Sequence, residues 1–216
     1  MVILIDNGHG QDTESKAKFS PLLKGSGLEI DEEFTSNGRF REWKYNRVIA
    51  RLLVDKFKSM GYDARLVVPE DKDISLGERV KRINKVCSEK GASNVLMVSV
   101  HSNAVGNGSE WMQGKGWECY STKGKTISDS LAESLYKRAE KCFEGRKIRK
   151  DLTDGDSDKE ANFYIIKNAN CAAVLTENFF YDNKDDLKYL TSDEGIHAVC
   201  RTHIEGILDY IESKKK

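Results

Sequence analysis

Val95-Leu96-Met97-Val98-Ser99-Val100 is the clearest buried strand in the sequence, and His101-Ser102-Asn103-Ala104 follows it directly. A short, continuous apolar run of this kind is typical of a parallel strand that is covered on both faces. Residues that directly follow such a strand lie at its carboxyl end, where ligands bind in open α/β sheets. This stretch therefore predicts both the fold and the edge of the sheet at which functional residues gather.

Shorter apolar runs and helical segments alternate on either side of this strand. The further predicted strands are Val2–Ile5, Ala64–Val68, Trp117–Tyr120, Phe163–Ile166 and Ala172–Thr176. Helical spacing of apolar residues predicts helices over about Tyr45–Met60, from Ser75 to Gly91, over Leu131–Cys142 and from Ser192 to about Ile211. Strand–helix alternation predicts an α/β fold, with one open, mostly parallel, twisted sheet of about six strands and helices on both faces.

Composition and charge favour a single domain, residues 1–216. Hydrophobic residues make up 38% and charged residues 32%, and the 2 prolines mark no linker. Lys+Arg and Asp+Glu balance at 35 each, so the basic excess that usually accompanies nucleic-acid binding is missing. We therefore expect one domain of 216 residues and no nucleic-acid partner.

The cysteines and the apolar runs limit where the protein works. Its five cysteines, Cys87, Cys119, Cys142, Cys171 and Cys200, form no C-x-x-C pair, which favours scattered, mostly buried thiols. No apolar run approaches the roughly 20 residues that a membrane helix needs. No basic region followed by an apolar signal segment opens the sequence. Either the protein is made in the cytoplasm or its export signal is absent from this sequence.

Three of the predicted strands run into reactive residues. His9 comes after the first strand, within the run Asp6-Asn7-Gly8-His9-Gly10. His101 follows the central strand, and Glu177 follows the strand Ala172–Thr176. Because the carboxyl ends of parallel strands meet at one edge of a sheet, we expect these three side chains to converge.

Two imidazoles and nearby carboxylates suggest a zinc site. Zinc accepts neutral imidazole nitrogen and carboxylate oxygen, and a catalytic zinc keeps one position open for water. Glu42, where the first helix begins, is the best third ligand, so the predicted metal-binding set is His9, Glu42 and His101. Glu177 then remains as an unligated carboxylate that faces the metal-bound water.

Each of these residues also has an ordinary structural explanation. A single histidine after a strand is more often a hydrogen-bonding group than a ligand. Glu42 fits a first-turn carboxylate favoured by the helix dipole, and Glu177 fits a solvated loop charge. Gly8 and Gly10 fit either backbone freedom in a tight turn or a close approach of the backbone to metal or substrate. Coincidence of all four reactive side chains at one edge is much rarer than any single match.

The other histidines and the tryptophans are weaker candidates. His203 lies on the apolar face of the last helix, which favours a satisfied core imidazole, and His197 on the same helix is expected to be more exposed. Trp117 is expected to pack in the core, whereas Trp43, beside Glu42, could line the cleft.

Several segments, in this order, resemble one known family. Ile5–Gly10 is similar to a D-P-G-H-G signature, and Ser99–Ala104 to an S-x-H-x-N-A signature. Further similar segments are Glu42–Asn46, Leu76–Asn84, Gly116–Tyr120, Ala173–Asn183 and Gly195–Tyr210. Together they resemble the zinc-dependent N-acetylmuramoyl-L-alanine amidases of the cell-wall amidase type, found in autolysins and phage endolysins.

The resemblance implies a zinc amidohydrolase with peptidoglycan as its substrate. Its Zn²⁺ would be held by His9, Glu42 and His101, with Glu177 as the catalytic carboxylate that moves protons. The bond cleaved would be the amide between N-acetylmuramic acid and L-alanine. We expect a monomer that acts at the bacterial cell wall, periplasmic or extracellular, or released from the cytoplasm as an endolysin. Two alternatives stay open: a zinc peptidase that cuts within the stem peptide, and a non-catalytic peptidoglycan-binding protein.

The sequence departs from the family pattern in three places. Asn7 replaces the usual proline, and Asn178-Phe179-Phe180 stands where the family commonly has a glycine-phenylalanine pair. Residues 10–41 are longer than is typical of the family, which predicts an inserted loop or flap over the cleft. These departures concern substrate preference more than the metal.

Overall fold

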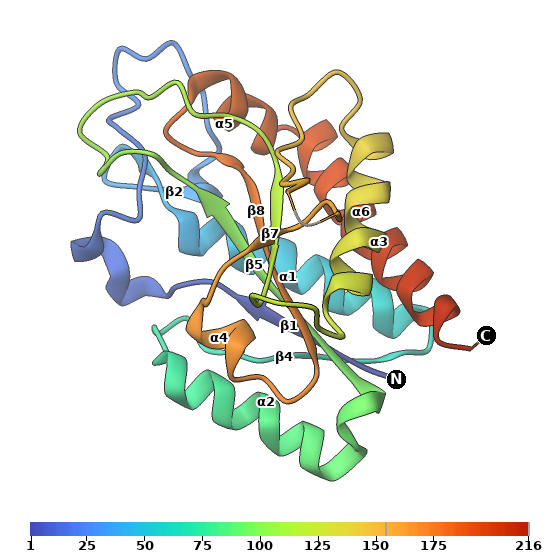
Figure 1. Cartoon of the computed structure of the whole chain (residues 1–216). Helices are drawn as coiled ribbons and strands as arrows, with labels where there is room; N and C mark the ends of the chain where they lie inside the picture. Colours follow the sequence, from blue (N-terminus) through green and yellow to red (C-terminus); the bar gives the residue numbers. More distant parts are fainter. Residues whose placement is uncertain (154, 216) are drawn as a thin grey trace.

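A six-stranded sheet forms the centre of the molecule (Figure 1). The computed structural model describes residues 1–153 and 155–215. The strand order is β4-β1-β5-β8-β6-β7, and neighbouring strands are parallel except for the β8–β6 pair. The strands are β1 (Val2–Asn7), β4 (Asp63–Leu66), β5 (Val95–Asn103), β6 (Glu118–Ser121), β7 (Lys159–Glu160) and β8 (Ala172–Phe180).

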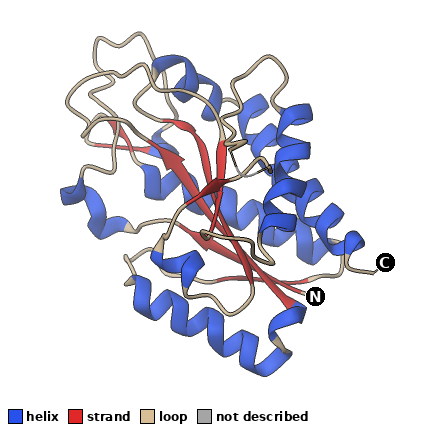
Figure 2. Ribbon diagram, viewed as in Figure 1, coloured by secondary structure: helices blue, strands red, loops and turns tan. Residues whose placement is uncertain are grey.

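Helices cover both faces of this sheet (Figure 2). One face carries α1 (Glu42–Ser59), α3 (Asp129–Cys142), α5 (Lys184–Leu190) and α6 (Asp193–Ser213). The opposite face carries α2 (Leu76–Lys90) and the single turn α4 (Tyr164–Lys167). The predicted α/β architecture, with a mostly parallel sheet between helical layers, is therefore confirmed.

Strand β1 shows why this sheet forms between two layers. All six of its residues are buried. Ile3 and Ile5 pack into the core on the α1 side, whereas Val2 and Leu4 pack on the α2 side. Side chains alternate between the two faces of a strand, so an unbroken apolar run can be buried only between two covering layers. Each such aliphatic side chain contributes about 1.5–3 kcal/mol when fully buried, and this core fixes where the strands end.

One predicted strand is wrong. The run Phe163–Ile166 lies largely in helix α4, and the sixth strand is instead β7 at the edge of the sheet. Ile165 and Ile166 are buried against the α2 layer, whereas Phe163 and Tyr164 are exposed. A four-residue apolar run has no period long enough to separate a strand from one helical turn, and tertiary packing decides. Strand β7 has only polar residues and gives no apolar signal.

Two central strands are longer than predicted, and the additional residues include two of the predicted site residues. Strand β5 continues to Asn103 and β8 to Phe180, so His101 and Glu177 lie inside strands rather than just beyond them. The sequence also gave no prediction for α5. The start of α6 is confirmed, because the Ser192 hydroxyl caps it by accepting a hydrogen bond from the Gly195 N–H at 3.1 Å.

Residues 10–41 form a folded excursion between β1 and α1. It contains the 3₁₀ helices η1 (Gln11–Lys16) and η2 (Glu32–Phe34) and the strand pair β2 (Thr35–Ser36) and β3 (Arg39–Phe40). Phe34 and Phe40 are buried against Tyr45 of α1, with ring centroids 5.6 and 5.9 Å from it. Arg39 Nη1 donates to the Gly108 carbonyl at 2.7 Å, which ties the excursion to the loop after β5. Its action as a flap stays a prediction.

The remaining sequence expectations concern membranes and cysteines. Within residues 1–153 and 155–215, no helix has the length and apolar character needed to cross a membrane. All five cysteines are free, and Cys87, Cys119 and Cys171 are buried. The prediction of scattered, mostly buried thiols is therefore confirmed.

Candidate metal centre and catalytic cleft

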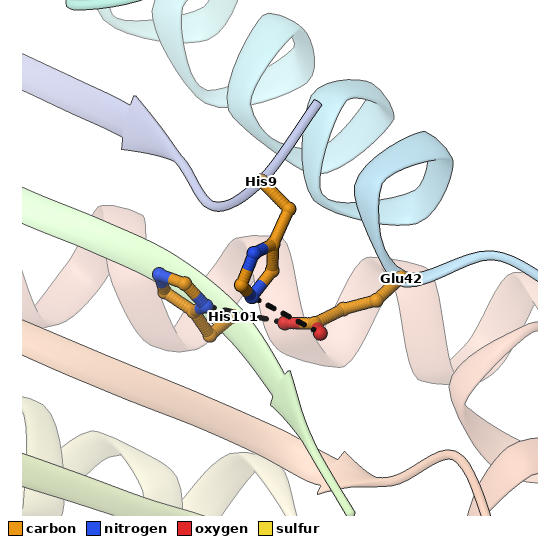
Figure 3. Close-up of side chains that lie close together, drawn as sticks. All are labelled: His9, Glu42 and His101. Carbon is orange, nitrogen blue, oxygen red and sulfur yellow. Dashed lines mark hydrogen bonds and ion pairs between the residues drawn. The ribbon is translucent and has the colours of Figure 1, made fainter. Parts of the chain in front are cut away.

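The carboxyl ends of β1, β5 and β8 bring the predicted site residues together. His9 lies two residues beyond β1, and His101 and Glu177 are register partners on the adjacent parallel strands β5 and β8. Glu42 is the first residue of α1, whose N-terminus points to the same edge. Figure 3 shows the side chains of His9, Glu42 and His101 directed toward one another from these three elements.

The Glu42 carboxylate lies between the two imidazoles. Its Oε1 is 3.1 Å from Nδ1 of His101, and its Oε2 is 3.3 Å from Nε2 of His9. The two imidazole rings are perpendicular, with centroids 4.9 Å apart. One ligand atom from each residue lies within 4.8 Å of the others. This separation fits three donors arranged around one small cation.

The electrostatics of the three residues also suit a cation. Burial would raise the pKa of Glu42, but the charge of His9 and the hydrogen bond with His101 hold that pKa well below its usual value. Burial would lower the pKa of His101, yet the Glu42 carboxylate raises it. Glu42 Oε2 lies 3.3 Å from His9 Nε2, but this buried oxygen has no hydrogen-bonding partner among the described residues. An ionised buried carboxylate with a free oxygen beside two imidazoles is a donor set that zinc accepts.

Glu177 stands beside this set with an unpaired carboxylate. Burial raises its pKa to about 8, and the Glu42 charge adds to that effect, while His101 opposes it. Its Oε2 is buried and lacks a hydrogen-bonding partner. A carboxyl group with its pKa near neutrality can both accept and release a proton at physiological pH.

Two cavities adjoin the imidazoles and form one cleft with two lobes. The first, of 280 Å³, extends toward Asp73 and Arg79, and we call it the α2 lobe. The second, of 240 Å³, extends toward Glu177 and the aromatic rings of Phe163 and Tyr164, and we call it the α4 lobe. Both lobes are lined by His9, Lys18, Leu76, His101 and Ile165.

His9 is held in an uncommon backbone conformation by two arginines. Its φ is 63°, a left-handed value that few non-glycine residues adopt. The His9 carbonyl accepts hydrogen bonds from Arg47 Nη1 at 2.9 Å and from Arg79 Nη2 at 3.2 Å. Arg79 is itself fixed by the buried carboxylate of Asp6, with Nη1 2.7 Å from Oδ1. Asp6 therefore acts on His9 indirectly, through Arg79.

Gly8 and Gly10 are required by close approach. A Cβ at Gly8 would lie 2.2 Å from the His101 ring, and a Cβ at Gly10 would lie 2.2 Å from the backbone of Asp73. Neither glycine has a positive φ, so space rather than backbone freedom explains them. The sequence left open a tight turn or a close approach to metal or substrate, and the structure instead explains both glycines by close packing against His101 and Asp73.

A β-bulge lies next to His101 and Glu177. The register of β5 and β8 shifts between His101 and Asn103, and Phe179 adopts a φ of 61°. Phe179 is fully buried between the rings of Phe143 and Tyr189, with centroids 4.9 and 5.3 Å away. Positive φ at a bulky residue is strained, and this packing holds it in place. The glycine-phenylalanine departure noted in the sequence coincides with this bulge.

Glu118 is a buried carboxylate whose surroundings sequence reasoning missed. It is the register partner of Glu177 on β6, so both carboxylates lie on the same face of the sheet. Its Oε1 accepts from Asn103 Nδ2 at 2.7 Å, and its Oε2 accepts from Arg149 Nε at 2.6 Å and Lys159 Nζ at 2.8 Å. The only signal in the sequence was a glutamate at the start of a predicted strand, which does not reveal its partners.

The remaining histidines and tryptophans have structural roles. His203 is fully buried, with Nε2 2.9 Å from Thr176 Oγ1, and His197 is exposed, as predicted. Trp117 is fully buried, which confirms core packing. Trp43 packs against the Arg47 guanidinium, 5.3 Å from its ring, and lines neither lobe of the cleft.

Two imidazoles and two carboxylates at the carboxyl edge of an α/β sheet, beside a cleft, are the arrangement expected of a metal-dependent hydrolase. The sequence matches the profile of the N-acetylmuramoyl-L-alanine amidase family over residues 3–209, and the chain belongs to this family.

Individual relatives agree with the family match. The chain is 33% identical to an endolysin of Bacillus phage SPP1 over 174 residues, which cover 76% of this chain and 57% of the endolysin. It is 26% identical to an N-acetylmuramoyl-L-alanine amidase of Bacillus licheniformis over 211 residues, which cover 95% of this chain and 66% of that protein. The chain thus spans less than two thirds of the length of these relatives.

A solved structure confirms the fold independently. An N-acetylmuramoyl-L-alanine amidase of Nostoc punctiforme superposes with a TM-score of 0.71 at 22% identity, covering 98% of this chain and 97% of that one. At this level of identity the likeness concerns the fold alone.

Proposed function

We propose that this protein hydrolyses the amide bond between N-acetylmuramic acid and L-alanine in peptidoglycan, at the bacterial cell wall. The convergence of His9, Glu42 and His101 beside Glu177 carries this proposal. Membership of the amidase family supports the choice of bond. We expect the protein to act as a monomer.

His9, Glu42 and His101 would hold a Zn²⁺ ion. Bound in this cleft, zinc would supply Lewis-acid chemistry, acidifying water and polarising the scissile carbonyl. The protein contributes the geometry: Arg47 and Arg79 fix the His9 loop. Asn46, one helical turn after Glu42, donates to Glu42 Oε1 at 3.3 Å and to the Gly8 carbonyl at 3.2 Å.

Glu177 would move the protons of the reaction. Its carboxylate accepts a proton from the attacking water as the carbonyl carbon is attacked. The resulting carboxylic acid then returns that proton to the nitrogen of L-alanine as the C–N bond breaks. Its unpaired Oε2 and its pKa of about 8 suit a group that passes a proton in both directions.

Product analysis tests the reaction directly. Purified peptidoglycan is digested with the zinc-loaded protein, and the products are identified by mass spectrometry. Released stem peptides with a free L-alanine amine are expected. Cleavage elsewhere in the stem peptide would indicate a zinc peptidase, and binding to peptidoglycan without cleavage would indicate a non-catalytic wall-binding protein.

Metal analysis tests the ligand set separately. The purified protein is expected to bind one Zn²⁺ ion per chain, and His101→Ala is expected to lose it. His203→Ala serves as the matched control, because it removes a buried imidazole that lines neither lobe of the cleft. Equal zinc content in both variants would contradict the assignment of His101.

A further inference from the structure

The excursion of residues 10–41 places a lysine at the junction of the two lobes. Lys18 lines both the α2 lobe and the α4 lobe, together with the two imidazoles. Its backbone carbonyl accepts the N–H of Glu42 at 3.3 Å, so the chain at Lys18 is fixed against the start of α1. Lys18 thus reaches the cleft from a segment that is longer than is usual in the family.

The ammonium group of Lys18 is available to a ligand. Lys18 is half-buried, and no hydrogen bond or ion pair of its side chain is formed with the residues that the structure describes. The other cations of the α2 lobe differ in this respect. Lys16 lies 3.4 Å from Asp73, and Arg79 is bound by Asp6.

The charges of the cleft favour an anionic ligand near Lys18. Lys18 and Glu177 line the same α4 lobe, so the ammonium group of Lys18 lies on the same cavity as that carboxyl group. With a divalent ion held by His9, Glu42 and His101, the ion and Lys18 would together carry more positive charge than Glu42 and Glu177 offset. A partly desolvated surplus of positive charge attracts an anionic group of the substrate.

In the substrate of the proposed reaction, the negatively charged group nearest to the scissile amide lies on the peptide side. The muramyl side of the scissile amide has neutral hydroxyl and acetamido groups. On the peptide side, the residue after L-alanine is a glutamate whose carboxylate is free in some cell walls and amidated in others. One residue spans about 3.3–3.6 Å, so this carboxylate lies within reach of a lysine at the edge of the reaction site.

We propose that Lys18 is a positioning residue that pairs with the carboxylate of the second stem-peptide residue. This inference rests on the proposed function and adds a substrate preference to it. The ion pair would orient the stem peptide and set the scissile carbonyl against Glu177 and the ligand set. Non-amidated stem peptides are therefore the preferred substrates.

The test compares two soluble disaccharide-tetrapeptides that differ only in this group, carboxylate or amide, with the zinc-loaded full chain. The wild type is expected to favour the carboxylate form by about tenfold in kcat/KM, mainly through KM, which corresponds to about 1.4 kcal/mol. Lys18→Met is expected to abolish this preference by weakening only the carboxylate form. Lys18→Arg keeps the charge and is expected to preserve it.

Lys16→Met is the matched control, because Lys16 lines the α2 lobe but is already paired with Asp73. It is expected to keep the wild-type preference. Equal loss of turnover on both substrates in Lys18→Met would overturn the inference and point to stabilisation of the reacting carbonyl instead. Equal cleavage of both substrates by the wild type would also overturn it and leave the proposed function intact, whereas no amide cleavage at all would refute the function itself.

Discussion

Glu177 and Glu118 are register partners on β8 and β6, with Glu118 buried and Glu177 half-buried, and the pKa values of their carboxyl groups are shifted in opposite directions. Burial raises the pKa of Glu177 to about 8. Burial would also raise the pKa of Glu118, but hydrogen bonds from Lys159, Arg149 and Tyr120 lower it below its usual value. Two glutamates in one register row therefore have different chemistry.

Hydrogen-bonding partners, rather than burial, therefore distinguish a structural carboxylate from a reactive one. Both oxygens of Glu118 accept hydrogen bonds, whereas Oε2 of Glu177 has no partner. A buried polar atom without a partner costs free energy, and natural structures rarely retain one without a use. On this basis Glu177 should matter for activity and Glu118 for stability.

The largest expected effect is loss of activity in Glu177→Gln. The amide has nearly the same shape but cannot accept and return a proton, so peptidoglycan hydrolysis should fall by about 10²–10⁴-fold. Zinc content should be unchanged, because Glu177 is not one of the proposed ligands. Turnover is measured by release of L-alanine amines, and zinc by metal analysis of the same preparation.

The same variant also tests the stability half of the comparison. Glu177 has no strong partner to lose, so the midpoint of thermal unfolding of Glu177→Gln should match or exceed that of the wild type. A variant that stays active, or one that unfolds at a clearly lower temperature, would break the contrast with Glu118.

Glu118→Gln should show the reverse pattern. The variant leaves Arg149 and Lys159 without their shared carboxylate, and losing hydrogen bonds to charged groups costs about 1.5–3 kcal/mol. Both cations are partly exposed and can regain water, so we expect the lower part of that range. For a chain of this size the thermal midpoint should fall by about 3–6 °C. Differential scanning calorimetry measures this shift, with Glu160→Gln on the adjacent strand β7 as the control, because Glu160 is exposed and a glutamine oxygen can still accept the hydrogen bond from the Gly124 N–H.

Sequence patterns predicted much of the site because its donors follow apolar strands. His9, His101 and Glu177 could be placed at one edge of a sheet, since parallel strands end together. The helix that begins at Glu42 supplied the fourth member. The elements that the sequence did not predict correctly are short. Helix α4 has too few residues to show a period, and strand β7 has no apolar signal.

The supporting residues could not be predicted for a different reason. Arg47, Arg79 and Glu118 act through partners that are far away in the sequence; Arg79 binds Asp6 across 73 positions. Charged side chains are usually solvated, so a sequence gives no reason to bury these three. Their roles follow from tertiary contacts alone.

The imidazoles of His101 and His203 show that neighbouring groups also decide the pKa of a histidine. The Glu42 carboxylate raises the pKa of His101, although burial opposes it. Burial lowers the pKa of His203 to about 4, and its ring is satisfied by Thr176 and by the Val199 carbonyl at 2.8 Å. His101 therefore lies beside a charged carboxylate, whereas His203 is a neutral element of the core.

The smallest expected effect is a pH dependence of stability that belongs to His203. The unfolded chain protonates this histidine near pH 6.5, whereas the folded protein does so only near pH 4. The unfolded state thus binds more protons between these values, so stability is full above pH 6.5 and declines as the pH falls. Linkage gives a loss of about 1 kcal/mol between pH 7.0 and 5.5 from this group. Urea unfolding at both pH values measures it in the wild type and in His203→Gln, which lacks the titrating group. The decline in the free energy of unfolding should be smaller in His203→Gln than in the wild type by that amount. An identical decline in both proteins would mean that His203 titrates in the folded core as it does in water.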